Sequence, residues 1–322
     1  MKILSGNFLS QILDIFKRAN KQQLDQSEII AELIKIVEHQ SIQLELEDKF
    51  INSSSTIDNS IIQKQRQLDA ESLDTLNCLL PWSSYNKLSN STIIGGAYTS
   101  LKRSAPHQIP DKHINVLQEY CNLNDDCSAI EFGCFEGHYT ASLATICKKV
   151  YGLDSRIENV IKTLVRCWFL GLEDKVSVDL INLETDSLVN FYQTRYKLDT
   201  IDIAHHRGVL YHLADPVAHL IDVSNLCNKY LYLHTQYATP EQAVSDYESP
   251  LGKYLVFMYK EEAINYSPFA GMVSQAIWLQ KSDLFSILKQ LGFTQIKEIS
   301  DTQERNGCRI ELIAAKTGAE LR

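Results

Sequence analysis

EFGCFEGHYTASLA, residues 131–144, follows a short apolar run at 128–130. Glu131 ends that run, and Gly133 and Gly137 come directly after it. Because glycine lets a backbone turn tightly, this ExGxxxG pattern predicts a strand that passes through a close loop into a helix. In a parallel α/β sheet such a loop lies at the carboxyl edge, where ligands bind.

Two phosphate-binding patterns fail on this loop. A dinucleotide fingerprint that starts at Gly133 would need glycines at positions 135 and 138, which are Phe135 and His138. A Walker loop from the same glycine would need a glycine at 138 and a lysine at 139, where the chain has Tyr139. The ligand of this loop is therefore not expected to bind through phosphate.

Two carboxylates point to a different ligand. The run VYGLD predicts the next strand and ends in Asp154, at the offset where α/β nucleotide sites place an acid that accepts hydrogen bonds from ribose hydroxyls. Glu131, at the end of the first strand, suits a cationic ligand. An adenosine with a positive charge and no phosphate fits both features, so we expect S-adenosylmethionine as the cofactor.

Strands and helices alternate in the chain beyond residue 122, which predicts an α/β fold with a parallel sheet. Short β-branched or aromatic runs mark the strands, and amphipathic segments fill most of the gaps. The expected strands are 128–132, 150–154, 176–181, 201–206, 229–235 and 308–315, and the expected helices are 140–148, 157–170, 216–226 and 281–291.

The order of these motifs resembles the seven-stranded, Rossmann-like class I S-adenosylmethionine-dependent methyltransferases. EFGCFEGHYTASLA, then Asp154, then IDIAHHRGVLYHLADP carry the resemblance, and GVLYHLADP is similar to the subgroup that has GVLYHxxDP after its fourth strand. The likeness continues through LYLHTQYATPEQA, PFAGMVSQAIWL and NGCRIEL, and so covers about residues 81–322. It implies that Asp154 binds the ribose and that Asn182 replaces the usual acid beside the adenine. The cofactor-binding residues expected on this basis are Glu131, Gly133, Cys134, Gly137, His138, Asp154, Asn182, Leu183 and His205.

The chain is expected to contain three regions. Residues 1–80 have apolar residues at helical spacing, which predicts an α-helical N-terminal region that packs on its neighbour or pairs two chains as a homodimer. Residues 81–120 contain turn formers and aromatic residues, as in a linker and cap over the catalytic face. Residues 121–322 form the methyltransferase domain.

Composition narrows the partners. The net charge of −9 disfavours binding to nucleic acid. No apolar run approaches the roughly 20 residues that cross a bilayer, and the start has no signal-peptide core, so a cytoplasmic protein without a membrane partner is expected. The eight cysteines have no CxxC spacing, which favours reduced thiols over a zinc site.

A histidine cluster follows the fourth and fifth expected strands. Methyl transfer to a protic acceptor requires a group that removes a proton, and histidine titrates in the right range. The candidate catalytic residues are His206, His212, Tyr211 and Arg207. His219 is expected at the surface. A metal held by the cluster is the alternative, but the spacing matches no known ligand pattern and shows no carboxylate fixed beside the histidines, so no metal is expected.

The acceptor side is expected to come from His234 and the segment before the last helix. That segment is rich in aromatic residues and would form a lid, an acceptor pocket or a packed subdomain. The resemblance places Gln275, Trp278 and Arg309 over the active site, and Arg309 could pair with a carboxylate on the acceptor.

These features predict methyl transfer to a small molecule or biosynthetic intermediate. GVLYHLADP also resembles the carboxymethyltransferases of wobble uridine in tRNA, although the acidic balance of the chain counts against that substrate. A non-catalytic methyltransferase fold that serves as a binding module is the third interpretation, and the intact loop counts against it.

Overall fold

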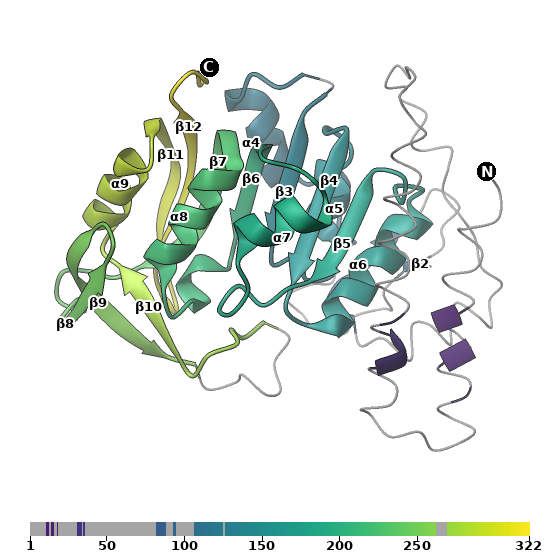
Figure 1. Ribbon diagram of the computed structural model, residues 1–322, viewed down its shortest axis with the longest axis horizontal. Coiled ribbons are helices and arrows are strands. Elements are labelled where there is room, and N and C mark those ends of the chain that lie inside the picture. Colours follow the sequence, from purple (N-terminus) through teal and green to yellow (C-terminus); the bar gives the residue numbers. More distant parts are fainter. Residues whose placement is uncertain are drawn as a thin grey trace. The chain divides into compact units, whose positions relative to one another are not determined.

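The structure is a computed structural model, and Figure 1 shows its ribbon. It describes residues 11–12, 14–15, 18, 31–33, 35, 82–87, 93–94, 106–124, 126–261 and 269–322. Every described residue before position 80 is helical. The rest of the expected N-terminal region, and with it the expected boundary at residue 80 and the pairing of two chains, lies outside the described residues.

A seven-stranded sheet with the strand order β11-β12-β7-β6-β3-β4-β5 organises the chain. The pairs β3–β6, β6–β7 and β4–β5 are parallel, whereas β12 runs antiparallel to both of its neighbours. The Rossmann-like seven-stranded fold expected from the sequence is confirmed. Its strands are β3 (Ser128–Phe132), β4 (Lys149–Asp154), β5 (Val176–Leu180), β6 (Ile201–Arg207), β7 (Cys227–Tyr237), β11 (Phe293–Glu304) and β12 (Gly307–Lys316).

Helices fill most of the connections between these strands. They are α4 (Lys112–Tyr120), α5 (His138–Leu143), α6 (Ile157–Phe169), α7 (Leu188–Arg195), the 3₁₀ turn η2 (Leu210–His212), α8 (Pro216–Leu226) and α9 (Lys281–Gln290). The helix expected at 140–148 is wrong at its C-terminal end, because α5 stops at Leu143. The chain turns there, and the hydroxyl of Thr145 donates to the carbonyl of Ser142 at 2.7 Å.

The segment before the last helix is a packed sheet. β8 (Ser245–Ser249), β9 (Gly252–Lys260) and β10 (Gln275–Leu279) pair antiparallel in the order β10-β9-β8. Tyr259 stacks on Trp278 with ring centroids 4.7 Å apart. This arrangement matches the packed subdomain that the sequence allowed. A further pair, β1 (Asn86–Lys87) with β2 (Ile93–Ile94), is also antiparallel.

The chain divides into two compact units. Unit 1 comprises Met1–Asp111 and Cys134–Leu180, and unit 2 comprises Lys112–Gly133 and Ile181–Arg322. Among the described residues, no helix combines the length and the apolar character that crossing a bilayer requires.

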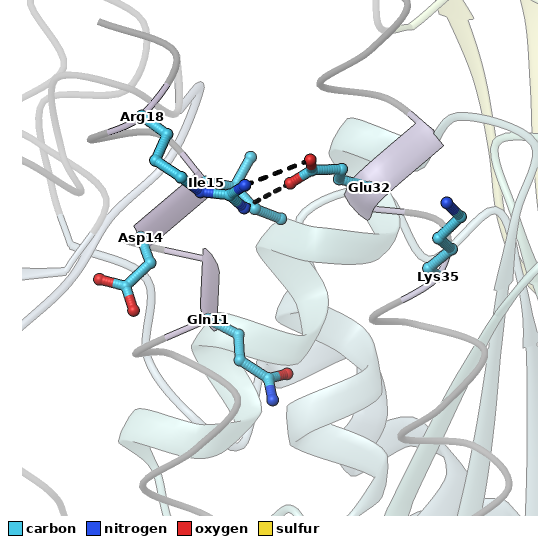
Figure 2. Close-up of a pocket in the computed structure, with 6 residues that line it drawn as sticks. All are labelled: Gln11, Asp14, Ile15, Arg18, Glu32 and Lys35. Atoms are coloured by element: carbon cyan, nitrogen blue, oxygen red, sulfur yellow. Dashed lines mark hydrogen bonds and ion pairs between the residues drawn. The ribbon is translucent and has the colours of Figure 1, made fainter. Parts of the chain in front are cut away.

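An open pocket of about 560 Å³ lies among the helical residues near the N-terminus in unit 1. Figure 2 shows Arg18 reaching towards Glu32, with which it forms an ion pair at 2.5 Å. Both side chains are at least one-third exposed, and such surface pairs stabilise a fold by about 0–1 kcal/mol. The six residues that line this pocket are Gln11, Asp14, Ile15, Arg18, Glu32 and Lys35, and none of them is an expected site residue.

Candidate functional site

The loop that follows β3 is shaped by its second glycine. Gly137 has a φ of 75° and forms the N-cap of α5. A Cβ at this position would lie 2.8 Å from the Cα of Thr163 in α6, so the loop backbone lies directly on that helix. Only glycine satisfies both the positive φ and the close approach. The expectation of a tight loop is confirmed here.

Cys134 holds the same loop from inside unit 1. Its backbone N–H donates to the carbonyl of Leu153 at 2.8 Å, and its Sγ accepts a hydrogen bond from the hydroxyl of Thr163. The side chain is only 2% exposed. The side chain of Cys134 therefore contacts α6 and its N–H contacts β4. Any contact with a ligand is expected from its backbone.

Asp154, at the carboxyl end of β4, is held by its own surroundings. Its Oδ2 accepts the N–H of Phe135 at 2.9 Å, and its Oδ1 accepts the N–H of Arg156 and the amide of Asn159. Burial raises the pKa of this carboxyl to about 6, although the three hydrogen bonds oppose the rise. An ionised carboxylate has about four lone-pair sites, so Asp154 keeps capacity for a further donor.

A buried ion cluster links the loop to residues 83 and 84, which come much earlier in the chain. Glu136 accepts the N–H of Ser83 at 2.5 Å and the hydroxyl of Ser84 at 2.6 Å. Lys162 and Arg166, one turn apart on α6, lie 3.4 and 3.8 Å from the same carboxylate. All three charged side chains are at most 1% exposed. Burial lowers the pKa of Arg166 to about 10, which still leaves it charged at neutral pH.

His138, the first residue of α5, pairs with a carboxylate in unit 1. Its Nε2 lies 2.7 Å from Oδ2 of Asp111, and its ring packs against that of His107 at 4.0 Å. The Nδ1 atom of His138 is buried. The N–H of Asp111 also donates to the hydroxyl of Ser142, so residues 107–111 are fastened to the start of α5.

In unit 2, one face of the sheet carries a row of polar side chains. The register pairs Glu131 with His205 and His205 with Tyr232, so these three residues share a face of β3, β6 and β7. Nδ1 of His205 lies 3.7 Å from Glu131, and its ring stacks on that of Tyr232 at 4.7 Å. Glu131, the carboxylate of the ExGxxxG pattern, therefore lies beside His205, which was also expected to bind the cofactor.

The same face continues through Arg207 and Glu311. Both contact the hydroxyl of Tyr232, which donates to Glu311 at 2.6 Å. His113 of α4 lies 3.3 Å from Glu311 and 3.4 Å from Arg207. Burial alone would raise the pKa of Glu311, but the bonds from His113 and Tyr232 and the charge of Arg207 outweigh it and hold the pKa at about 2.

His206 projects to the opposite face of β6. Its Nε2 lies 2.9 Å from Nε2 of His219 in α8, and its ring packs against Phe132. Burial, reinforced by the neighbouring histidines, lowers the pKa of His206, so the ring is neutral at pH 7. The expected surface position of His219 is wrong. His219 is 5% exposed, because the apolar helix α8 turns that side chain onto β6.

Asn182 and Leu183 occupy the turn after β5. The side-chain oxygen of Asn182 accepts the N–H of Glu184 at 3.1 Å, and its backbone N–H donates to Asp186. The carboxylate of Glu184 accepts the N–H of Ala214, which ties this turn to the segment after η2. Asn182 and Leu183 are both half-buried. Among the described residues of unit 2, neither contacts another residue that was expected in the site.

Tyr211 and His212 lie at the end of η2. Nδ1 of His212 makes a short hydrogen bond to Oε1 of Glu261, whose side chain is 6% exposed. The ring of Tyr211 packs on the ring of His212 at 4.2 Å, and its hydroxyl lies 3.5 Å from Nη2 of Arg309. The expectation that no carboxylate is fixed beside the histidines of the cluster is wrong, because Glu261 bonds His212 and Glu131 lies 3.7 Å from His205.

Of the two expected residues in β10, Trp278 contacts Tyr211, and Gln275 is exposed. The indole N–H of Trp278 donates to the carbonyl of Tyr211 at 2.8 Å. Gln275 is exposed at the start of β10. His234 lies opposite Glu311 on the polar face. Burial, with the charges of Arg207 and Arg309, lowers the pKa of His234 to about 3, so its imidazole is neutral.

Among the residues that the structure describes, no group of three or more His, Cys, Asp or Glu side chains is arranged to hold a metal ion.

The fold resembles those of many solved structures, among them two of the same domain. The N-terminal domain of EvdMO1 with SAH (S-adenosylhomocysteine) bound has 19% identity and a TM-score of 0.63, over 78% of this chain and 98% of that chain. The same domain in the presence of SAH and D-fucose has 21% identity and a TM-score of 0.62 over the same shares. The chain shares the fold of this domain. No protein-family model matches the chain, and no curated protein matches it in sequence.

Several residues of these clusters were not expected from the sequence, among them the carboxylates Glu136, Glu261 and Glu311 and the imidazole of His113. Glu136 and its partners on α6 had a weak signal, because Lys162 and Arg166 lie at helical spacing among the mostly apolar residues of that helix. Glu261 had none, because it lies 49 positions along the chain from its partner His212.

Proposed function

We propose that this chain is a class I S-adenosylmethionine-dependent methyltransferase that acts on a small molecule or a biosynthetic intermediate. The observation that carries the proposal is Asp154 at the carboxyl end of β4, preorganised by Phe135 and Asn159 and joined to a loop that only glycine can form at position 137. The shared fold with a domain solved with SAH bound supports it.

The residues fit such a ligand in each unit. In unit 1, Asp154 retains acceptor capacity for ribose hydroxyls, and the backbone of Cys134 and Gly137 lines the turn. In unit 2, Glu131 and His205 form a polar pair suited to the charged methionine end, and Asn182 and Leu183 are the proposed adenine contacts. The bound donor supplies an electrophilic methyl group on a sulfonium. The chain's own contribution is to orient the acceptor, exclude water and accept a proton.

The first experiment is titration calorimetry of the full chain with S-adenosylhomocysteine. Asp154→Ala should weaken binding by about 1–3 kcal/mol, because it removes charge-assisted hydrogen bonds to the ribose. Asp246→Ala, at an exposed carboxylate of β8, is the matched control and should bind as the wild type does. Circular dichroism checks that both variants fold.

The outcomes separate the rival functions. No binding by the wild-type chain would favour a non-catalytic module. Clear preference for carboxylated S-adenosylmethionine together with tRNA binding would favour the wobble-uridine carboxymethyltransferase reading. Unchanged affinity in a folded Asp154→Ala variant would remove the ribose role from that residue.

A further inference from the structure

His212 and Glu261 form a pair with one open end. Nδ1 of the imidazole is bonded to the buried carboxylate, while the His212 side chain keeps 17% of its surface exposed. Nε2 of His212 has no hydrogen-bond partner among the residues that the structure describes. A carboxylate on Nδ1 selects the tautomer with the proton on Nδ1, which leaves Nε2 with a lone pair.

The backbone of His212 is clamped on two sides. A Cβ on Gly271 would lie 2.8 Å from the carbonyl oxygen of His212, so that segment packs directly against the residue. On the other side, Trp278 donates to the carbonyl of Tyr211. A proton acceptor held this way loses little entropy when it reacts, which is a requirement for efficient proton transfer.

Charged groups of both signs lie near His212, because Glu261 bonds its Nδ1 and Arg309 pairs with Glu304 at 3.3 Å. The guanidinium of Arg309 lies 5.2 Å over the ring of Tyr211, which itself packs on His212. Arg309 also retains a buried Nε that has no hydrogen-bond partner among the described residues. A neutral amine has a free lone pair and can lose its proton after the transfer, whereas a neutral hydroxyl gains most from a base during the transfer. A carboxylate acceptor is already ionised at neutral pH and would need no base.

We propose that His212 is the general base for methylation of an acceptor hydroxyl, with Glu261 as the positioning residue that holds its tautomer. This rests on the proposed function. The hydroxyl proton moves to Nε2 of His212 while the oxygen lone pair forms the new O–C bond. The methyl group leaves the sulfonium, whose S–C electron pair stays on sulfur. The products are a methyl ether, a neutral thioether and an imidazolium that pairs with Glu261 until the proton passes to water.

The first test needs no acceptor. Long-range ¹H–¹⁵N NMR of histidine-labelled full chain, assigned by the signal that His212→Gln removes, reports the tautomer at pH 8. We expect the proton on Nδ1 in the wild type, and loss of this preference in Glu261→Ala. Glu248→Ala, at an exposed carboxylate of β8, is the control and should leave the signal unchanged. A proton on Nε2 in the wild type would overturn the proposal.

The second test identifies the acceptor atom. Phenol, benzyl alcohol, benzylamine and benzyl mercaptan share a ring and differ in the reacting group, and mass spectrometry detects their methylated products. We expect transfer to the two hydroxyl probes. His212→Gln should lower their kcat by about a hundredfold or more, and Glu261→Gln by about 10–100-fold, with KM for S-adenosylmethionine nearly unchanged. Glu261→Asp should restore part of the loss.

The two proposals fail differently. Absence of S-adenosylhomocysteine binding would reject the methyltransferase itself. Binding of the cofactor with transfer to the amine or thiol alone would reject only the hydroxyl assignment. If none of the four probes is methylated while S-adenosylhomocysteine binds, the hydroxyl assignment is rejected, and a proton on Nδ1 supports only the role of Glu261 in holding the tautomer.

Discussion

Two histidine–carboxylate pairs in this chain use the same chemistry for different ends. In unit 1, His138 pairs with Asp111 at 2.7 Å, its Nδ1 is buried, and His107 packs on its ring. In unit 2, His212 pairs with Glu261, yet its side chain is about twice as exposed, at 17% against 8%. Both imidazoles are oriented by a carboxylate. The comparison shows that access to the second ring nitrogen, rather than the carboxylate, distinguishes a candidate base from a fastener.

The largest loss of folding stability is expected in the buried ion cluster around Glu136, which has a purely structural role like that of the His138–Asp111 pair. Glu136→Ala removes the buried carboxylate that Lys162 and Arg166 share, and breaking a buried pair costs roughly 3–5 kcal/mol. Urea denaturation followed by circular dichroism measures the loss. Glu248→Ala is the control, and surface changes of this kind shift stability by less than about 0.5 kcal/mol. A loss below about 1 kcal/mol would mean that water reaches the cluster.

The second prediction compares how the loss of each carboxylate affects folding stability and the methyl-transfer rate. Asp111→Asn should cost about 1–2 kcal/mol of stability, because it weakens a charge-assisted bond in a half-buried site, while the methyl-transfer rate changes little. Glu261→Gln should do the reverse and lower the rate more than the stability. Denaturation and turnover measured on both variants give the four values. The comparison breaks if Asp111→Asn lowers kcat as strongly as Glu261→Gln does.

The smallest effect concerns a third pair, His113 with Glu311. The folded pKa of Glu311, about 2, lies below its unfolded value, so its contribution to stability is present above pH 4.5. That contribution is lost as the pH falls from about 4.5 towards 2. Glu311→Gln should therefore flatten the acid side of the stability curve by about 1 kcal/mol. Urea titrations of both proteins from pH 6 to pH 2.5 measure this. Parallel curves would assign the acid sensitivity to other groups.

The fold could be predicted because its signals are local. Runs such as SAIEF and VYGLD have the strand period, and β3 and β4 form where those runs stand. The position of His212 after the fourth parallel strand also follows from local sequence. His206 illustrates a signal that was present and unused, because alternation along a strand places adjacent residues on opposite faces. His205 and His206 could not both face one site.

The partners of the candidate site could not be predicted in the same way. Glu261 directly follows β9, which pairs antiparallel with β10, and this pairing brings Glu261 to His212. The register of the two strands depends on packing around Trp278. Glu311 meets His113 and Arg207 because β12 runs antiparallel beside β7. Pairings across such sequence distances depend on tertiary structure, which a single sequence leaves open.

Gly271 has a consequence for tracing this protein among distant chains. Its conformation is one that any residue could adopt, so nothing in the local turn demands glycine there, yet a single methyl group would press on the His212 carbonyl. Substitution at 271 would thus displace the histidine without altering any charge. Among distant chains that share this fold, a histidine after the fourth strand accompanied by a glycine at this place would be a better marker of a His212-like environment than the histidine alone.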